Sequence, residues 1–195
     1  MQLTLRHPSS YKTTRWSGGT TTELYILPEG ADYASRQFDL RISSATVEAE
    51  ESTFTSLPGF QRILTPLEEP LEILHPDRQT QVLLQPYDLH AFSGGEGTKS
   101  WGQGRDFNVI YRPDLAVQVS ITKTGGSEVF LAPGDVYLFF SAQAQRVDFS
   151  WDEETEVESL DLPDLGLAQL EGIDQAGTLT IQPSQAPLLV IQISR

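Results

Sequence analysis

Short β-type runs separated by glycine and proline recur along this chain, and they restrict its fold more than any other feature. Runs of branched and aromatic residues bounded by turn residues are typical of strands. Helical periodicity is almost absent, and only residues 31–36 and 162–170 suit a helical turn or two. Many short strands with regular turns indicate an all-β sandwich or barrel. We predict strands at residues 2–6, 23–27, 37–43, 62–66, 71–75, 79–84, 106–112, 116–122, 128–131, 136–140, 146–149, 157–160, 178–182 and 188–194.

An internal repeat narrows the choice of fold. Residues 82–93 resemble residues 129–141, because each has an apolar strand, a Pro-x-Asp turn and an apolar-aromatic strand. Proline followed by glycine or aspartate favours a tight turn. The unit looks like one corner of a cupin, the double-stranded β-helix barrel. Two copies suggest a bicupin, a single compact unit over 1–195 with an approximate division into 1–113 and 114–195, although a chance match in a β-rich sequence is the alternative.

Composition excludes several classes of protein. The chain has 195 residues and no cysteine, so it can bury a sizeable core but cannot rely on disulfides or thiolate metal sites. Its start lacks the apolar run of a signal peptide, and no segment approaches the roughly 20 apolar residues of a membrane span. The net charge of −14 argues against binding nucleic acid or an anionic membrane. We therefore expect a cytoplasmic protein.

The basic residues are unevenly distributed. After Asp114 they are limited to Lys123, Arg146 and Arg195, so the arginines able to bind an anion lie mostly in the first part. The acidic run at 152–156 is interpreted as a solvated loop or sheet edge.

Three polar segments within strand-like surroundings are candidates for a binding site: residues 16–24, 38–43 and 105–110. In the second segment, alternation directs Phe38, Leu40 and Ile42 to one side. The residues between them then face solvent or a polar pocket. A guanidinium such as that of Arg41 holds a carboxylate through two parallel hydrogen bonds. The predicted ligand-binding residues are Trp16, Gly18, Gly19, Thr21, Glu23, Arg41, Ser43, Arg62, Asp106 and Asn108.

Structural roles are open alternatives for these residues. Arg41 has Asp39, Asp106 and Glu23 as candidate ion-pair partners, and Arg62 follows a Pro-Gly turn that it could tie down. The glycine pair permits either close approach of a ligand or a positive φ in a turn. The pair is not a nucleotide-binding loop, because the Gly-x-x-x-x-Gly-Lys pattern and a following helix are missing.

The histidines give no sign of a metal centre. Cupin enzymes usually hold a metal with two histidines two residues apart, whereas this chain has only His7, His75 and His90. We therefore predict no metal, no cofactor and no catalytic residue, and we interpret His90 as a partly buried barrel residue. A Ser-His-Asp arrangement has no support either.

With these residues, the chain resembles the HutD/Ves family, whose proteins are associated with histidine utilisation. The resemblance runs from Trp16 to about Arg112, and one departure is that Ser17 precedes only two glycines where many members have three. The motifs are Trp16-x-Gly18-Gly19-Thr20-Thr21-x-Glu23, Phe38-Asp39-x-Arg41-Ile42-Ser43, Phe54-Thr55-x-Leu57-Pro58-Gly59-x-x-Arg62 and Arg105-Asp106-Phe107-Asn108.

The resemblance implies a non-enzymatic bicupin that regulates histidine utilisation by binding an acidic pathway metabolite, of the N-formylglutamate or urocanate class. The first alternative is a cupin-type enzyme acting on a small amino-acid or sugar derivative, with Glu23 or Asp106 and His90 as acid–base pair. The second is an interaction protein with a vestigial cavity. The apolar run at 188–194 needs a partner strand, either within the chain or across a homodimer.

Overall fold

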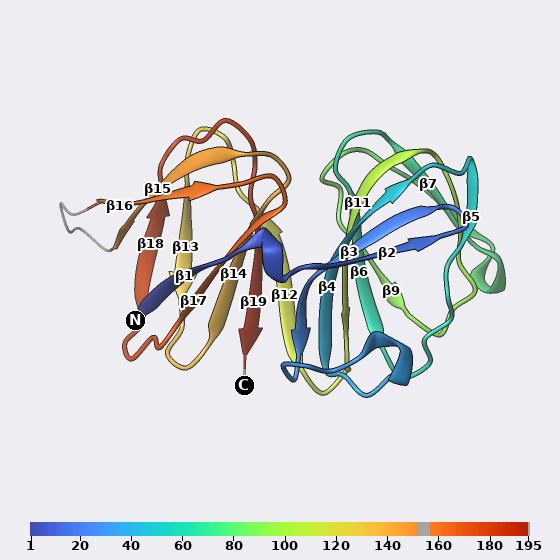
Figure 1. Ribbon diagram of the computed structural model, residues 1–195, viewed down its shortest axis with the longest axis horizontal. Helices are drawn as coiled ribbons and strands as arrows, with labels where there is room; N and C mark the ends of the chain where they lie inside the picture. The colour runs from blue at the N-terminus through green and yellow to red at the C-terminus, as the bar shows by residue number, and fades with distance from the viewer. Residues whose placement is uncertain (152–156, 195) are drawn as a thin grey trace. The chain divides into compact units, whose positions relative to one another are not determined.

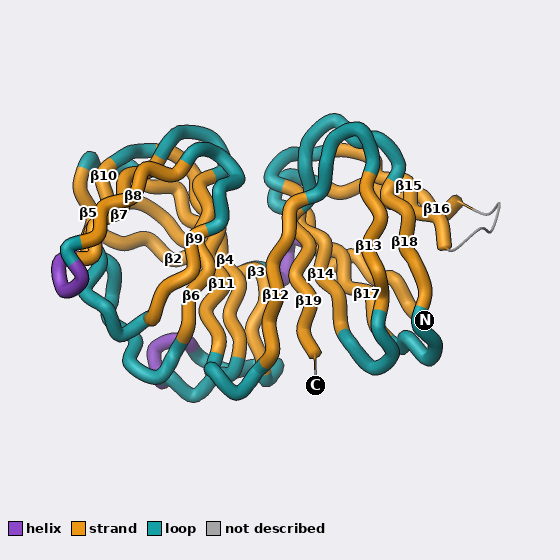
Figure 2. Tube along the Cα trace, turned by 180° about the vertical axis from the view of Figure 1, so that it is seen from behind, coloured by secondary structure: helices purple, strands orange, loops and turns teal. Residues whose placement is uncertain are grey.

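The computed structural model describes residues 1–151 and 157–194, which are almost entirely strand and loop (Figure 2). The all-β prediction is confirmed. The described helices are three single 3-10 turns, η1 (Pro8–Ser10), η2 (Tyr33–Ser35) and η3 (Pro76–Arg78). In this part of the chain, no helix has the length and apolar character needed to span a bilayer. The acidic run at 152–156 lies outside the described residues.

The chain forms two compact units, which we call the continuous unit (Tyr11–Asp114) and the split unit (Met1–Ser10 with Leu115–Arg195). The division expected between residues 113 and 114 lies one residue from this boundary. The first ten residues differ from the expectation, because they belong with the second half of the chain. The reason is that β1 (Gln2–Arg6) pairs along its whole length with β17 (Gly166–Glu171) (Figure 1).

The continuous unit consists of two antiparallel sheets. One buried cluster, around Leu64, Ile73 and Phe92, has residues from both sheets, and another, around Phe38 and Phe60, combines loop residues with the six-stranded sheet. The six-stranded sheet has the order β2 (Lys12–Trp16), β3 (Gly19–Leu27), β4 (Leu40–Val47), β11 (Gly104–Tyr111), β6 (Gln61–Pro66) and β9 (His90–Ser93). The four-stranded sheet has the order β5 (Glu51–Thr53), β10 (Lys99–Trp101), β7 (Leu71–His75) and β8 (Thr80–Leu84).

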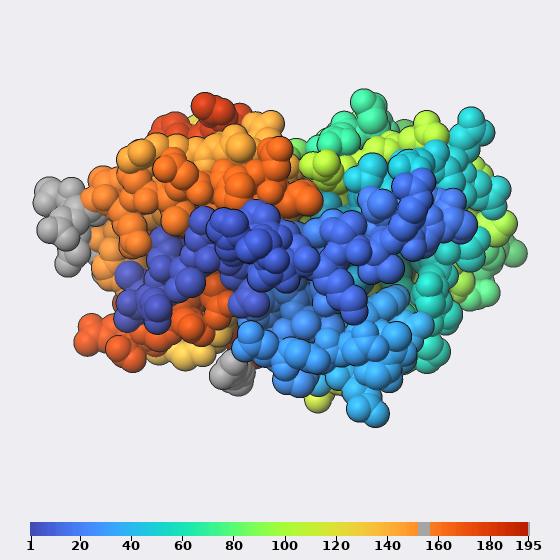
Figure 3. Space-filling model, viewed as in Figure 1, coloured from blue at the N-terminus to red at the C-terminus, as the bar shows by residue number. Residues whose placement is uncertain are grey.

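The split unit also has two antiparallel sheets. Its N-terminal residues, dark blue in Figure 3, lie against the orange residues of β17, as the pairing of the two strands requires. The five-stranded sheet has the order β1, β17, β14 (Val136–Ser141), β19 (Leu189–Ser194) and β12 (Ala116–Ile121). The four-stranded sheet has the order β13 (Ser127–Leu131), β18 (Gly177–Ile181), β15 (Gln145–Trp151) and β16 (Val157–Leu162). The apolar C-terminal strand β19 therefore has a neighbour within the chain on each side, β14 and β12.

The internal repeat corresponds to the same strand–turn–strand corner in both units. Tyr87 and Gly134, which occupy matching positions after the proline, have φ values of 70° and 80°. The amide of Asp88 donates to Gln85 O at 2.9 Å, and the amide of Asp135 donates to the matching Ala132 O at 3.3 Å. The repeat in the sequence thus encodes a repeated turn in the structure.

Two kinds of element differ from the sequence-based expectation. Residues 162–170, expected to form a helical turn or two, are instead largely in strand β17, because β17 pairs with both β1 and β14. Strands β2, β5 and β10 were not predicted. All five residues of β2 are exposed, and β5 and β10 are three residues long, so neither alternation nor an apolar run marks them.

Candidate functional site

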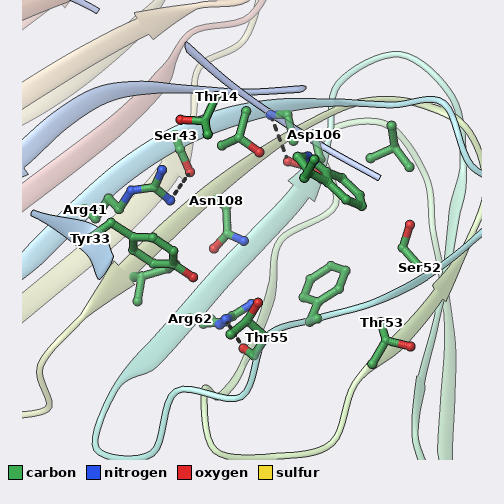
Figure 4. A pocket seen from close by; sticks show the side chains of 16 residues that line it. Thr14, Tyr33, Arg41, Ser43, Ser52, Thr53, Thr55, Arg62, Asp106 and Asn108 are labelled. Atoms are coloured by element: carbon green, nitrogen blue, oxygen red, sulfur yellow. Dashed lines mark hydrogen bonds between the residues drawn. The ribbon is translucent and has the colours of Figure 1, made fainter. Parts of the chain in front are cut away.

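A cavity of about 310 Å³ opens on the inner face of the six-stranded sheet, wholly within the continuous unit (Figure 4). Strands β2, β3, β4, β6 and β11 provide one wall, and residues 52–55 provide the opposite wall. The residues that line it are Thr14, Trp16, Thr21, Tyr33, Arg41, Ser43, Ala45, Val47, Ser52, Thr53, Phe54, Thr55, Arg62, Asp106, Asn108 and Ile110.

Strand alternation brings the polar side chains to this face. In β4, Arg41, Ser43 and Ala45 line the cavity at intervals of two residues, and Asp106 and Asn108 do so in β11. Antiparallel pairing then places Asn108 beside Ser43 and Asp106 beside Ala45. The predicted direction of Arg41 and Ser43 is therefore correct. Asp39, expected on the same side, does not line the cavity and instead pairs with Arg112 at 3.4 Å.

Arg41 is held by the strand beside it. Its Nε donates to Glu23 Oε2 at 2.7 Å, and its Nη1 donates to Ser43 Oγ at 3.3 Å. Its guanidinium also lies 4.2 Å from the centre of the Tyr33 ring. Of the three carboxylates weighed as partners, Glu23 is the one that pairs with it. Glu23 itself does not line the cavity, so its place in the site is to fix Arg41.

Arg62 is a buried cation with few protein partners. Its side chain is only 4% exposed, and its Nη2 donates to Thr55 O at 2.6 Å. Its Nε has no hydrogen-bond partner in the described residues, and none of the ion pairs found there includes Arg62. Burial lowers the pKa of Arg62 from its usual value, because a charged group loses hydration there. An anion in the cavity would relieve this cost.

Two uncharged polar residues, Asn108 and Ser52, also line the cavity. Figure 4 shows Asn108 between Arg41 and Arg62. Asn108 Oδ1 and Ser52 Oγ are buried and lack a hydrogen-bond partner among the described residues. Buried polar atoms are nearly always satisfied in folded proteins, so a group of such atoms around one cavity indicates a place for a polar ligand.

Asp106 is a buried carboxyl group in the cavity lining, and its pKa is strongly shifted. The amide of Ala45 donates to Asp106 Oδ1 at 3.3 Å. Burial raises the pKa of this carboxyl from 3.8 to about 7, and the Ala45 amide and the charge of Arg62 oppose the shift only in part. A carboxyl group with such a pKa is partly protonated at neutral pH.

Gly18 and Gly19 do not line the cavity but allow close packing of the backbone and of Trp16 beside it. A Cβ on Gly18 would collide with the ring of Trp16, and one on Gly19, at φ 149°, would collide with the carbonyl oxygen of Thr46. These glycines let the β2–β3 turn lie against β4 and seat Trp16 at the cavity.

Seven of the predicted residues line the cavity: Trp16, Thr21, Arg41, Ser43, Arg62, Asp106 and Asn108.

Several lining residues were not predicted. Thr14, Ser52 and Thr53 belong to or adjoin strands that the sequence does not reveal, and Tyr33 lies in a turn. A signal for Phe54 and Thr55 was available, since both belong to the motif that leads to Arg62. The guanidinium of Arg62 lies 5.5 Å from the centre of the Phe54 ring.

The histidine pair lies apart from the cavity lining. His75 Nε2 and His90 Nε2 are 2.8 Å apart, although the residues are distant in sequence. The buried His75 also faces Thr98 Oγ1 at 3.3 Å and Glu96 Oε2 at 3.5 Å. Burial lowers the pKa of both histidines. The described residues contain no group of three or more His, Cys, Asp or Glu arranged to hold a metal ion.

Comparisons with known proteins agree with this architecture. Residues 8–186 match the family model described as HutD. The chain is 31% identical over 185 residues to an uncharacterized 21.2 kDa protein in the hutC 3′ region of Pseudomonas putida, and the match covers 93% of each chain.

Two solved structures extend the comparison. HutD from Pseudomonas fluorescens SBW25, determined in a formate condition, superimposes with a TM-score of 0.75 at 21% identity over 99% of this chain and 98% of that one. The formate complex of Lactobacillus farciminis oxalate decarboxylase gives a TM-score of 0.56 at 10% identity over 97% and 85%. At such identities the likeness shows the fold alone, and it confirms the predicted cupin fold class.

Proposed function

Because this chain belongs to the HutD family, we propose that it is a small-molecule-binding bicupin that regulates histidine utilisation by binding an acidic metabolite of that pathway. The family and the hutC-region location of the Pseudomonas putida relative supply the setting of histidine utilisation. The ligand class that we propose is a small carboxylate such as N-formylglutamate or urocanate. A fold shared by many proteins does not supply the function, so the support has to come from the cavity.

The observation that carries this proposal is Arg62, a buried guanidinium that forms no ion pair with any described carboxylate. Burying a cation without a counter-ion is costly, and a bound carboxylate provides one through charge-assisted hydrogen bonds. Arg41 supplies a second positive charge, and Asn108 supplies an amide that suits a formyl or second polar group. The cavity volume of about 310 Å³ suits a small metabolite.

A thermal-shift and calorimetric screen tests the proposal. We expect stabilisation by one of N-formylglutamate, urocanate or formate, with histidine and divalent metals as comparison compounds. Ligand at 100 times its dissociation constant stabilises by about 2.7 kcal/mol, which moves the midpoint by several degrees. Wild-type protein that binds none of the carboxylates would contradict the proposal.

Variants locate the binding. Arg62→Met retains most of the aliphatic length but removes the charge, and we expect it to weaken carboxylate binding by about 100-fold, with Arg41→Ala also weakening it strongly. Arg15→Met is the matched control, since Arg15 is exposed on β2 and pairs with Glu48 outside the cavity. Unchanged affinity in a folded Arg62→Met protein would place the ligand elsewhere.

The enzyme alternative finds less support in the geometry. Its acid–base pair required His90, and His90 does not line the cavity that holds Asp106. Glu23 is engaged by Arg41. Incubating the protein with each bound metabolite and following the metabolite by NMR distinguishes the two functions, since a binding protein returns its ligand unchanged.

A further inference from the structure

Asp106 is an acidic group inside a cavity that we propose binds an anion. Two negative charges would repel each other there, and the surroundings of Asp106 explain how its carboxyl group and the anion can share the cavity. Asp106 is buried and lines the same cavity as Arg62. None of the ion pairs among the described residues includes it, so no guanidinium neutralises it by direct contact. The hydrogen bond to its side chain is the 3.3 Å bond from the Ala45 amide.

The charged groups around Asp106 come from several elements. Arg62 on β6 shares the cavity, and so does Arg41 on β4, which is already paired with Glu23 on β3. Tyr33 in η2 also lines the cavity, whereas residues 52–55 opposite carry no titratable side chain.

Asp106 also lines a small hollow of about 10 Å³ together with Glu69 and Arg105. Burial raises the pKa of Asp106 to about 7, because it outweighs the opposing effects of the Ala45 amide and the Arg62 charge. Asp106 therefore changes its charge within the physiological pH range.

We propose that Asp106 contacts the bound anion as a neutral carboxylic acid, so that binding above neutral pH takes up one proton at Asp106. This inference rests on the proposed function of the cavity. A protonated carboxyl donates its O–H to an oxygen of the ligand, whereas an ionised one repels the ligand at short range. The proton comes from solvent and adds to the Asp106 carboxylate, and no other bond forms or breaks.

Proton uptake compensates the negative charge of the ligand. One negative ligand and one proton enter together, so the net charge inside the continuous unit is the same before and after binding. Affinity is then constant on the acidic side of neutrality, where Asp106 is already protonated. On the alkaline side, the dissociation constant rises about tenfold per pH unit, because each binding event must also capture a proton.

Isothermal titration calorimetry between pH 6 and pH 8.5 measures this linkage directly. The probes are formate and N-formylglutamate, which are carboxylates ionised throughout this range, and each titration is repeated in two buffers with different heats of ionisation. We expect about one proton taken up per ligand at pH 8.5 and about none at pH 6.

Asp106→Asn gives the matched variant, because an amide is neutral at every pH. Its affinity should stay constant from pH 6 to pH 8.5, with no proton uptake. Asp39→Asn is the control, since Asp39 is exposed, pairs with Arg112 and does not line the cavity. It should keep the wild-type pH profile.

The outcomes separate this inference from the proposed function. Carboxylate binding by the wild type with no proton uptake and no pH dependence overturns the inference and leaves the function intact. An Asp106→Asn protein that keeps the wild-type slope also overturns it. Should that variant fail to fold, the wild-type proton count decides. If neither probe binds at any pH, both this inference and the proposed binding of a carboxylate are overturned.

Discussion

The two units share one strand–turn–strand corner but use their interiors differently. In the split unit, β14 is buried along its whole length, and Phe139 and Phe149 pack edge to face at 5.4 Å within a large apolar cluster. The continuous unit contains a cavity lined by two arginines and a carboxyl group. A cavity of about 440 Å³ in the split unit is lined mainly by apolar side chains such as Phe149 and Leu179, so the two units differ in the chemistry of their cavities.

The buried polar groups show the same contrast. In the split unit, Asp135 accepts hydrogen bonds from Gln192 and Ser194, and Gln145 bonds with both backbone groups of Ala186. In the continuous unit, Arg62 Nε and Asn108 Oδ1 have no partner among the described residues. Polar groups that the chain satisfies hold the fold together, whereas the unsatisfied groups around the cavity are those on which the proposed ligand site rests.

The largest effect should come from matched core truncations. Phe139 and Phe92 occupy equivalent positions of the repeat, and Phe139→Ala should cost about 3–5 kcal/mol of unfolding free energy, because it opens a cavity in the larger cluster. Phe92→Ala should cost less, since its cluster is smaller. Urea denaturation measures both. A larger loss from Phe92→Ala would show that the continuous unit depends more on packing than the comparison allows.

Asp106→Asn should stabilise the protein at alkaline pH. The folded protein raises the pKa of Asp106 from 3.8 to about 7, so the wild type is penalised progressively as pH rises through this window. At pH 8 the amide variant should be more stable by roughly 2–4 kcal/mol, with little difference at pH 4. Denaturation at the two pH values tests this. An Asp106→Asn protein less stable than wild type at pH 8 would contradict burial as the main cause.

Gln145→Ala and Arg62→Met contrast a satisfied buried group with an unsatisfied one. Gln145→Ala should destabilise by about 1–3 kcal/mol, because both backbone groups of Ala186 lose a partner. Arg62→Met should be neutral or stabilising, since it removes an unpaired buried charge. Thermal denaturation without ligand compares them. Strong destabilisation by Arg62→Met would assign Arg62 to the structure of the unit instead.

The smallest expected effect concerns acid and the histidine pair. Folding lowers the pKa of His75 and His90, so the unfolded chain binds more protons and stability falls as pH drops below about 6.5. We expect the free energy of unfolding to fall between pH 7 and pH 5. A His90→Tyr variant, which copies Tyr137 of the split unit, should reduce this loss. The same acid response in the variant would point to other groups.

Elements with a distinct local pattern could be predicted from the sequence. Strands β1 and β7 lie where they were predicted, because alternation and flanking turns mark both ends. Alternation around Arg41 also predicted that Arg41 and Ser43 share one face, but it wrongly placed Asp39 beside them. The repeat predicted the two corners, since proline and aspartate act locally on the turn.

The missing parts depend on partners distant in sequence. Strand β5 is only three residues long and is defined by its pairing with β10, so Ser52 and Thr53 could not be placed in the site. The role of Glu23 as the partner of Arg41 required the register of β3 against β4, which has an irregularity between Glu23 and Tyr25. Likewise, no spacing rule joins His75 to His90.

The pairing of β1 with β17 has a consequence for synthesis of the protein on the ribosome. The continuous unit leaves the ribosome as one uninterrupted stretch, so it can fold while the rest of the chain is still being made. Strand β1 precedes the continuous unit in the chain but pairs with β17, which is made on the order of ten seconds later at usual elongation rates. During that time β1 lacks its partner strand β17. The five-stranded sheet of the split unit therefore cannot be completed until residues far beyond β1 have been made.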